Sequence, residues 1–204
     1  MKFNKKNRLA LAGVALAAIL TVGGSLAYFT DTDTRTNVMT LGKVEGTLTE
    51  STDEENTTTT ETGIEYNDPI MPGQSVSKKP IVSTTSDSES AYARVKVTVE
   101  GTYADGSTIP AAELAKIAFN YNTTAGWNLS TDGYVYYNTA LTAGQSTPEV
   151  FTTVTFPSEW NNDFANASVR VIVTGELIQA DNFTPTSVSG IITSWGSVDI
   201  KAAN

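Results

Sequence analysis

Two segments in which apolar and polar side chains alternate constrain the fold most strongly. In residues 91–100 every odd position is apolar, and the even positions carry Tyr92, Arg94, Lys96, Thr98 and Glu100. In residues 167–177 the predicted inward side chains are Ala167, Val169, Val171, Val173 and Leu177, and the predicted outward ones are Arg170, Thr174 and Glu176. A period of two is typical of strands with one buried and one hydrated face. We therefore predict two long strands covered on one side, with Ile172 as an apolar exception on the hydrated face.

Other segments extend this pattern. Shorter alternating runs or probable strands occupy residues 43–48, 75–84, 126–130, 134–138 and 150–156. Asp132-Gly133 favours a tight turn, so residues 127–129 and 134–137 are predicted to form a hairpin. Helix formers are concentrated only in residues 110–117 and 158–164. The sequence thus predicts an all-β protein with one or two short helices, an antiparallel β-sandwich that is jelly-roll-like.

The domain organisation follows from composition along the chain. Residues 1–8 are basic, residues 9–22 are apolar, and small residues follow. This order predicts a signal peptide over residues 1–27, cleaved between Ala27 and Tyr28. The alternative is a retained membrane anchor, although the apolar run is shorter than the roughly 20 residues that a spanning helix needs. We expect an N-terminal arm over 28–42, and then a single domain over 43–204 with a mobile Thr- and Glu-rich loop at 50–65.

Charge and cysteine content limit the partners. The whole chain has a formal net charge of −9, and the four positive charges of residues 1–27 are removed on cleavage, which leaves −13. An acidic surface of this size argues against nucleic acid or anionic membranes as partners. The chain contains no cysteine, so disulfides cannot stabilise it and a packed core or assembly must do so.

Missing side chains also exclude most catalytic chemistry. Without histidine or cysteine, a Ser-His-Asp triad, a Cys-His pair and a histidine-based zinc site are impossible. Ser75 and Lys78 match an S-x-x-K motif, but the S-D-N and K-T-G partner motifs are absent. Residues 31–33 could offer oxygens to calcium, yet they lack the glycine and final glutamate of a calcium loop. We predict no catalytic residues, metal ligands or cofactor, while a site built from carboxylates alone stays open.

Four aromatic residues allow two interpretations. Trp127, Tyr134, Tyr136 and Tyr137 could form a platform on which sugar rings stack. Aromatic residues in such a pattern more often pack inside a sandwich, where they bury a large apolar area. We favour packing, and a sugar-binding platform is the alternative.

Three motifs in order along the chain resemble a known family. They are the junction at residues 23–34, the turn at 71–76 and the strand at 91–97. Together they resemble the TasA/camelysin family of exported proteins processed by a SipW-type signal peptidase, and within it the BsaA-type biofilm matrix proteins. The match is specific over roughly residues 1–100. It implies a jelly-roll domain, cleavage by the peptidase and polymerisation into matrix fibres.

The resemblance also implies how subunits join. We expect a secreted structural subunit, not an enzyme, that forms a head-to-tail homopolymer by donor-strand exchange, in which the arm of one subunit adds a strand to the next. Within the arm, Val38, Met39 and Leu41 are the candidate donor residues. The arm could instead fold back on its own domain or stay disordered. Minor matrix subunits are possible further partners, and no stable membrane anchor is expected after cleavage.

Two other functions remain as alternatives to the fibre subunit. The first is a secreted carbohydrate-binding or adhesin module. The second is a protease like camelysin, which the absence of histidine ligands disfavours.

Covalent cross-linking of fibres is a further hypothesis. Fibres without cysteine can be locked by isopeptide bonds between lysine and Asn or Asp side chains. The candidate strand lysines are Lys43, Lys78, Lys79 and Lys96. Because alternation places Lys96 on the hydrated face, a bond there would have to form at an interface between subunits.

Overall fold

Antiparallel strands make up most of this protein. The structure is a computed structural model that describes residues 30–33, 44–60, 63–181 and 183–198. All ladders between the strands are antiparallel. In the described part of the chain, helical structure is limited to α2 (Ala111–Leu114) and two 3-10 turns, Thr123–Ala125 and Asn162–Phe164. The predicted all-β class is confirmed.

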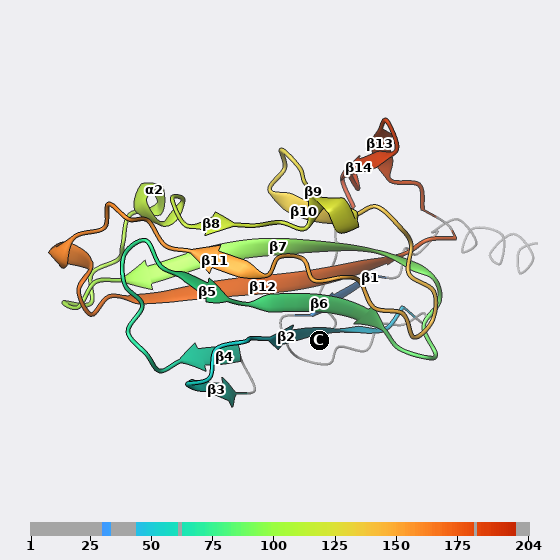
Figure 1. The fold of residues 1–204 in the computed structure, drawn as a ribbon. Coiled ribbons are helices and arrows are strands. Elements are labelled where there is room, and N and C mark those ends of the chain that lie inside the picture. Colours follow the sequence, from blue (N-terminus) through green and yellow to red (C-terminus); the bar gives the residue numbers. More distant parts are fainter. Residues whose placement is uncertain (1–29, 34–43, 61–62, 182, 199–204) are drawn as a thin grey trace, which may run out of the picture.

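A five-stranded sheet forms the first layer (Figure 1). Its strand order is β1 (Thr30–Asp33), β12 (Ser168–Gln179), β7 (Ala91–Thr102), β10 (Tyr134–Tyr137) and β9 (Trp127–Leu129). The two central strands pair along their full length of 12 residues, from Ser168 opposite Thr102 to Gln179 opposite Ala91. These are the two segments in which apolar and polar residues alternate along the sequence. The predicted hairpin around Asp132-Gly133 is also present, as β9 and β10.

Shorter strands form the second layer. They are β2 (Gly46–Ser51), β5 (Ser75–Ser77), β6 (Lys79–Thr84), β8 (Ala118–Phe119) and β11 (Thr153–Thr155). β2 pairs with β6, and β11 pairs with both β5 and β8. Backbone hydrogen bonds from Thr147 N to Val82 O and from Val150 N to Pro80 O join β6 to the segment that leads into β11. The β2–β6 pair and the β5–β11–β8 sheet are therefore continuous and form one layer.

The main core lies between the two layers. Val95, Val173 and Leu177 bury their side chains from the first layer, and Val76, Val82 and Val154 do so from the second. The odd positions of β7 and β12 face inward, as their alternation predicts, because successive side chains of a strand point to opposite faces. The result is a sandwich of two antiparallel layers, and the jelly-roll-like topology stays a prediction.

The loop predicted at residues 50–65 is wrong for most of that segment. β2 continues to Ser51, and β3 (Thr57–Thr60) pairs with β4 (Gly63–Tyr66) as a hairpin. Threonine is β-branched and favours strands even where it buries little apolar area. Tyr66 anchors the hairpin, because it packs against the core and its hydroxyl donates to Ser77 O at 2.6 Å.

The expected exposure of Arg94 and Glu176 is also wrong. Both lie on the predicted outer face of the first layer, yet they are only 5% and 8% exposed. The cause is the chain beyond residue 180, to which the sequence pattern assigned no strand. Here β13 (Thr186–Val188) and β14 (Ile191–Ser194) form a hairpin, and the following Trp195 packs over this part of the sheet.

The space around Gly46 and Gly175 shows how closely the two layers pack. A Cβ atom on Gly46 would overlap the Leu177 side chain and the Ser83 carbonyl oxygen, whereas one on Gly175 would lie 3.5 Å from Val82 Cγ2, an ordinary contact. We predict that Gly46→Ala lowers the free energy of unfolding by about 1–3 kcal/mol, as overpacking typically does. Gly175→Ala is the matched control and should change it much less. Urea unfolding of both variants measures this, and equal losses would contradict the packing described.

Candidate assembly edge

The N-terminal strand β1 adds to one edge of the five-stranded sheet. Its four residues pair with β12 in antiparallel register, from Thr30 opposite Ile178 to Asp33 opposite Gly175. The described part of the predicted arm, residues 30–33, therefore forms a strand, whereas the sequence predicted the donor role for later residues of the arm. The only local signal for a strand here is the alternation of threonine with aspartate. The predicted cleavage residues Ala27 and Tyr28 and the donor residues Val38, Met39 and Leu41 lie outside the described residues.

β1 covers only part of this edge. Along Ser168–Thr174 no described strand pairs with the side of β12 that faces away from β7. In an antiparallel strand the N–H and C=O groups of alternate residues point to opposite sides. Alternate residues of this segment therefore present donors and acceptors to whatever lies beside it. Such an edge is a template for pairing with another strand.

At the opposite end of the same sheet, the C-terminal hairpin lies over the outer face beside β9 and β10. β14 lies against the edge strand β9. Asn128 Nδ2 donates to Ile192 O at 3.3 Å, and Ser130 Oγ donates to Thr193 O at 2.6 Å. Along Ser168–Thr174, the β12 edge therefore has no strand partner among the described residues.

A buried polar cluster lies beside the β1 pairing site. Glu176 is directly opposite both Thr32 of β1 and Arg94 of β7. Its Oε2 lies 2.5 Å from Arg94 Nε, and both side chains are nearly buried. The guanidinium carbon also lies 3.8 Å from the centre of the Tyr134 ring and 4.5 Å from that of Trp195. Contacts between a desolvated guanidinium and aromatic ring faces stabilise this cluster in addition to the ion pair.

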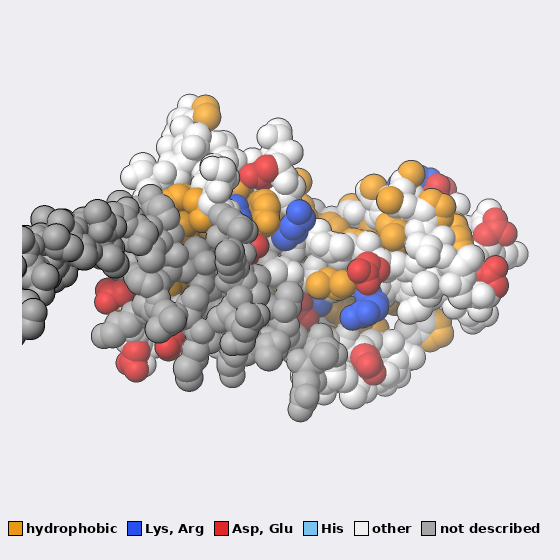
Figure 2. All heavy atoms as spheres, turned by 180° about the vertical axis from the view of Figure 1, so that it is seen from behind, with side chains coloured by type: hydrophobic (Ala, Val, Ile, Leu, Met, Phe, Trp, Pro, Cys, Tyr) orange, Lys and Arg blue, Asp and Glu red, His pale blue; other side chains and the backbone are white. Residues whose placement is uncertain are grey.

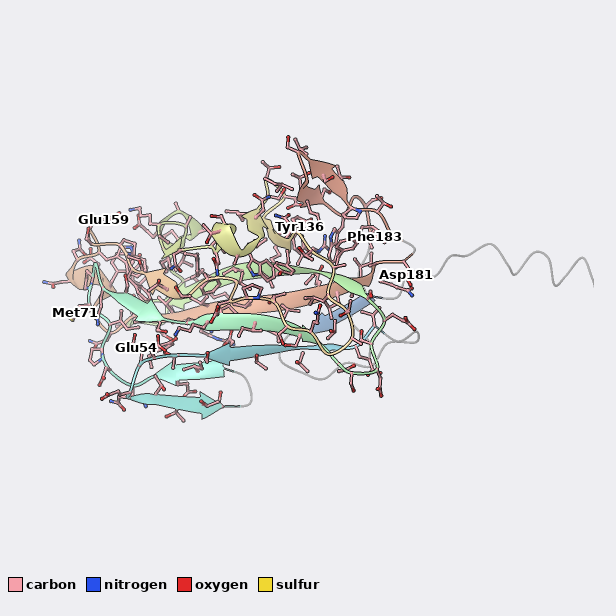
Figure 3. The ribbon with its side chains drawn as sticks, turned by 45° about the vertical axis from the view of Figure 1, so that its right-hand side comes forward. Glu54, Met71, Tyr136, Glu159, Asp181 and Phe183 are labelled. Atoms are coloured by element: carbon pink, nitrogen blue, oxygen red, sulfur yellow. The ribbon has the colours of Figure 1, made fainter. Side chains whose placement is uncertain are left out.

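Tyr136 completes the cluster from β10. Its hydroxyl accepts from Arg94 Nη1 at 3.3 Å and donates to Asp132 Oδ2 at 2.7 Å. In Figure 3, Tyr136 and Phe183 lie at the base of the C-terminal hairpin. Burial, together with the Asp132 carboxylate, raises the pKa of Tyr136 to about 12, against a partial opposing effect of Arg94. The Arg94, Glu176, Tyr136 and Asp132 side chains bond one another, while the buried Trp195 Nε1 has no hydrogen-bond partner. The bonds among these four side chains have the character of a structural network.

The candidate cross-linking lysines occupy different environments. Lys78 is buried, and its Nζ lies 2.6 Å from Glu50 Oε2, so a second chain cannot reach it in the folded subunit. Lys79 pairs near the surface with Asp53, Nζ to Oδ1 at 2.6 Å. Lys96 is exposed, as predicted, with its Nζ 5.0 Å from the centre of the Tyr134 ring. Lys43 lies outside the described residues. Among the described lysines, Lys79 and Lys96 are therefore the better candidates.

The four aromatic residues do not form one platform. Trp127 and Tyr136 are 1% and 0% exposed, which confirms the packing interpretation for these two. The Trp127 indole lies 5.2 Å from the Tyr137 ring on the core side, and its Nε1 donates to Pro148 O at 3.0 Å. Tyr134 and Tyr136 belong to the opposite face, because alternation along β10 separates them from Tyr137.

The two residues of the S-x-x-K match, Ser75 and Lys78, do not lie together. Ser75 faces outward, where its Oγ lies 2.7 Å from Thr155 Oγ1, while Lys78 points inward to Glu50. Positions three apart on a strand point to opposite faces. Among the described residues, no group of three or more Asp or Glu side chains is arranged to hold a metal ion. Within the same residues, no helix is long and apolar enough to cross a membrane.

No family model, curated protein or solved structure matches the chain. The resemblance to the TasA/camelysin family thus depends on the sequence motifs alone and stays a prediction.

Breaking the buried ion pair should be costly. We predict that Arg94→Met lowers the free energy of unfolding by about 3–5 kcal/mol, because it leaves the Glu176 carboxylate buried without its partner. The matched control is Lys116→Met, which removes a surface pair with Glu113 and should change stability little. Chemical denaturation measures both variants. Similar small losses would show that the Glu176 carboxylate is hydrated in solution.

The raised pKa of Tyr136 predicts a loss of stability at alkaline pH. The unfolded chain loses this phenolic proton near pH 10, whereas the folded protein keeps it up to about pH 12. The stability contributed by the protonated phenol is therefore complete below pH 10 and falls as the pH rises towards 12. Unfolding measured at several pH values should show this decline, and Tyr136→Phe should reduce its steepness. If the free energy of unfolding of the variant falls with pH as steeply as that of the native protein, other titrating groups cause the decline.

Proposed function

We propose that this protein is a secreted structural subunit that polymerises head-to-tail into extracellular matrix fibres by exchange of its N-terminal arm. The observation that carries the proposal is the partly occupied edge of β12. β1 fills the positions Gly175–Ile178, while the positions Ser168–Thr174 have no described strand beside them. The order of sequence motifs that resembles the TasA/camelysin family supports the same function.

The register of β1 defines what the rest of the edge would accept. Continued past Asp33, it places Met39 opposite Val169 and Leu41 opposite Ala167. The odd positions of β12 belong to the core-facing side of the strand, where Val169 and Ala167 pack against the main core. An arm in this register would therefore direct Met39 and Leu41 towards apolar neighbours, and Val38 towards the outer face beside Arg170.

A chain cannot place its own arm in this way. Gly46, at the start of β2, lies against the Leu177 side chain. Ala167 and Leu177 are ten residues apart along an extended segment, a distance of about 33 Å. The five residue steps from Leu41 to Gly46 span at most about 18 Å. A single chain is therefore too short to pair through Leu41 in this register, and the proposal assigns the full-length pairing to a second chain.

This geometry also gives the direction of growth. From its N-terminus, the arm of the donor runs from the Ile178 end of the acceptor edge to the Ser168 end. The β2 strand that follows the arm must then begin near the Ser168 end of the acceptor. The donor domain consequently lies beyond one end of the acceptor and leaves its own edge for the next chain. A contact of this heterologous kind produces an open filament unless its rotation happens to close.

The alternatives receive less support. A carbohydrate-binding module would need exposed aromatic rings, but Trp127 and Tyr136 are buried and the four aromatic residues are divided between two faces. A camelysin-like protease would need a metal or catalytic group that the composition does not supply.

Cysteine pairs can test the exchanged register, because the native chain has no cysteine. We predict that Met39→Cys chains, mixed with Val169→Cys chains under mild oxidation, form a disulfide between different chains. Residues directly opposite each other in an antiparallel ladder have Cα atoms about 4.5–5.5 Å apart, within the range of a disulfide. Non-reducing gels would show the mixed dimer, and electron microscopy of the unmodified protein would show filaments.

Two controls make this result specific. Met39→Cys mixed with Ile172→Cys is three positions out of register, about 10 Å along the strand, and should give only background coupling. Asp33→Cys combined with Gly175→Cys in one chain should lock the arm in cis and prevent polymerisation. If only this second pair forms, and the Met39 and Val169 pair stays reduced, the arm folds back on its own domain and the proposal fails.

A further inference from the structure

The C-terminal hairpin presents a second open strand edge. β14 lies against β9, so the free side of β13 faces outward, and all three of its residues, Thr186–Val188, are exposed. No described strand pairs with this side of β13. Figure 1 shows the hairpin standing out from the two layers. Its backbone edge is therefore accessible to another strand.

Apolar side chains gather around this edge. Val188 and Ile191 pair directly across the hairpin and are 62% and 42% exposed. They are two of the four large hydrophobic side chains that are exposed in the described part of the chain. Single exposed apolar residues need no explanation, but a cluster beside an open edge is typical of an interaction surface.

The hairpin carries no charge. Residues 183–198 contain no Asp, Glu, Lys or Arg, in a chain whose net charge is −9. In Figure 2 the protruding hairpin is almost free of acidic and basic side chains and has a hydrophobic side chain at its tip. Edge strands that must avoid pairing usually carry a lysine, a proline or a bulge that turns them away. β13 carries no lysine; Pro185 precedes it and a register shift occurs between Thr186 and Ser187, so Ser187 and Val188 are the positions left for pairing.

We infer that β13 pairs edge to edge with the β13 strand of a second copy of this chain. Two copies of an acidic protein repel each other where their charged surfaces meet. Because the hairpin carries no charge, two copies can make contact there without this electrostatic repulsion. An antiparallel pair of identical strands is self-complementary about a two-fold axis. With Ser187 opposite Ser187, each Val188 would lie beside Thr186 of the other copy, and one Val188–Ile191 pair would lie on each side of the two-fold axis.

This contact is independent of arm exchange and would join subunits of neighbouring fibres sideways. It uses the opposite edge region of the five-stranded sheet from β12. A filament built by exchange would therefore carry one such hairpin on each subunit. Lateral association through it would make bundles without altering the filament itself.

A single cysteine at the two-fold axis tests the inference. The full-length chain carrying Ser187→Cys, made in a host that can export and process it, should oxidise rapidly to a disulfide-linked dimer. Ser158→Cys, an equally exposed serine remote from the hairpin, is the control for random collision. Val188→Asp, introduced beside Ser187→Cys, should abolish the fast coupling because it brings two like charges together. Val188 is exposed, so the folded subunit should tolerate this change.

The outcomes separate this contact from arm exchange. Val188→Asp should also remove bundles from electron micrographs while the disulfide between Met39→Cys and Val169→Cys chains still forms. Coupling of Ser187→Cys no faster than that of Ser158→Cys would overturn the β13 contact, as would bundles that persist in Val188→Asp. Loss of the Met39–Val169 disulfide in otherwise normal chains would overturn arm exchange alone.

Discussion

The paired strands β7 and β12 are the constraint on which the other features depend. Their 12-residue ladder fixes which side chains face the core and which face outward. It also places Arg94 opposite Glu176, so that one outer surface contains a buried charge pair which the C-terminal hairpin and Trp195 cover. Because β12 is paired with β7 on one side only, the same ladder creates the long edge that β1 occupies in part.

The two outer strands of this sheet have different neighbours among the described residues. Beside β9, hydrogen bonds from the Asn128 and Ser130 side chains hold β14 over the outer face of the sheet. The β12 edge has a four-residue strand at one end. Under the proposed arm exchange, the part of the β12 edge with no described strand beside it is where a strand would be added.

Some of this arrangement could be predicted from the sequence. Alternation over residues 91–100 and 167–177 identified the two central strands and their inward faces, and Asp132-Gly133 identified a hairpin. The same alternation led to a wrong prediction that Arg94 and Glu176 are exposed. A period of two shows on which face of a strand a side chain lies, but it does not show whether another segment covers that face. The Thr-rich hairpin at 57–66 was missed because few apolar residues mark it. Residues 30–33 pair through their backbone, which side-chain patterns describe poorly.

Competition between pairing in cis and in trans explains why such an arm can act as a switch. In cis, four residues form a ladder at little entropic cost, because the arm is already attached to the domain. In trans, the same edge accepts roughly seven more residues, and each further backbone hydrogen bond contributes about 0.5–1.5 kcal/mol net. The longer ladder must offset the loss of free motion of a second chain, which amounts to about 4–15 kcal/mol. Under the proposed arm exchange, this balance would favour single subunits at low concentration and filaments at high concentration.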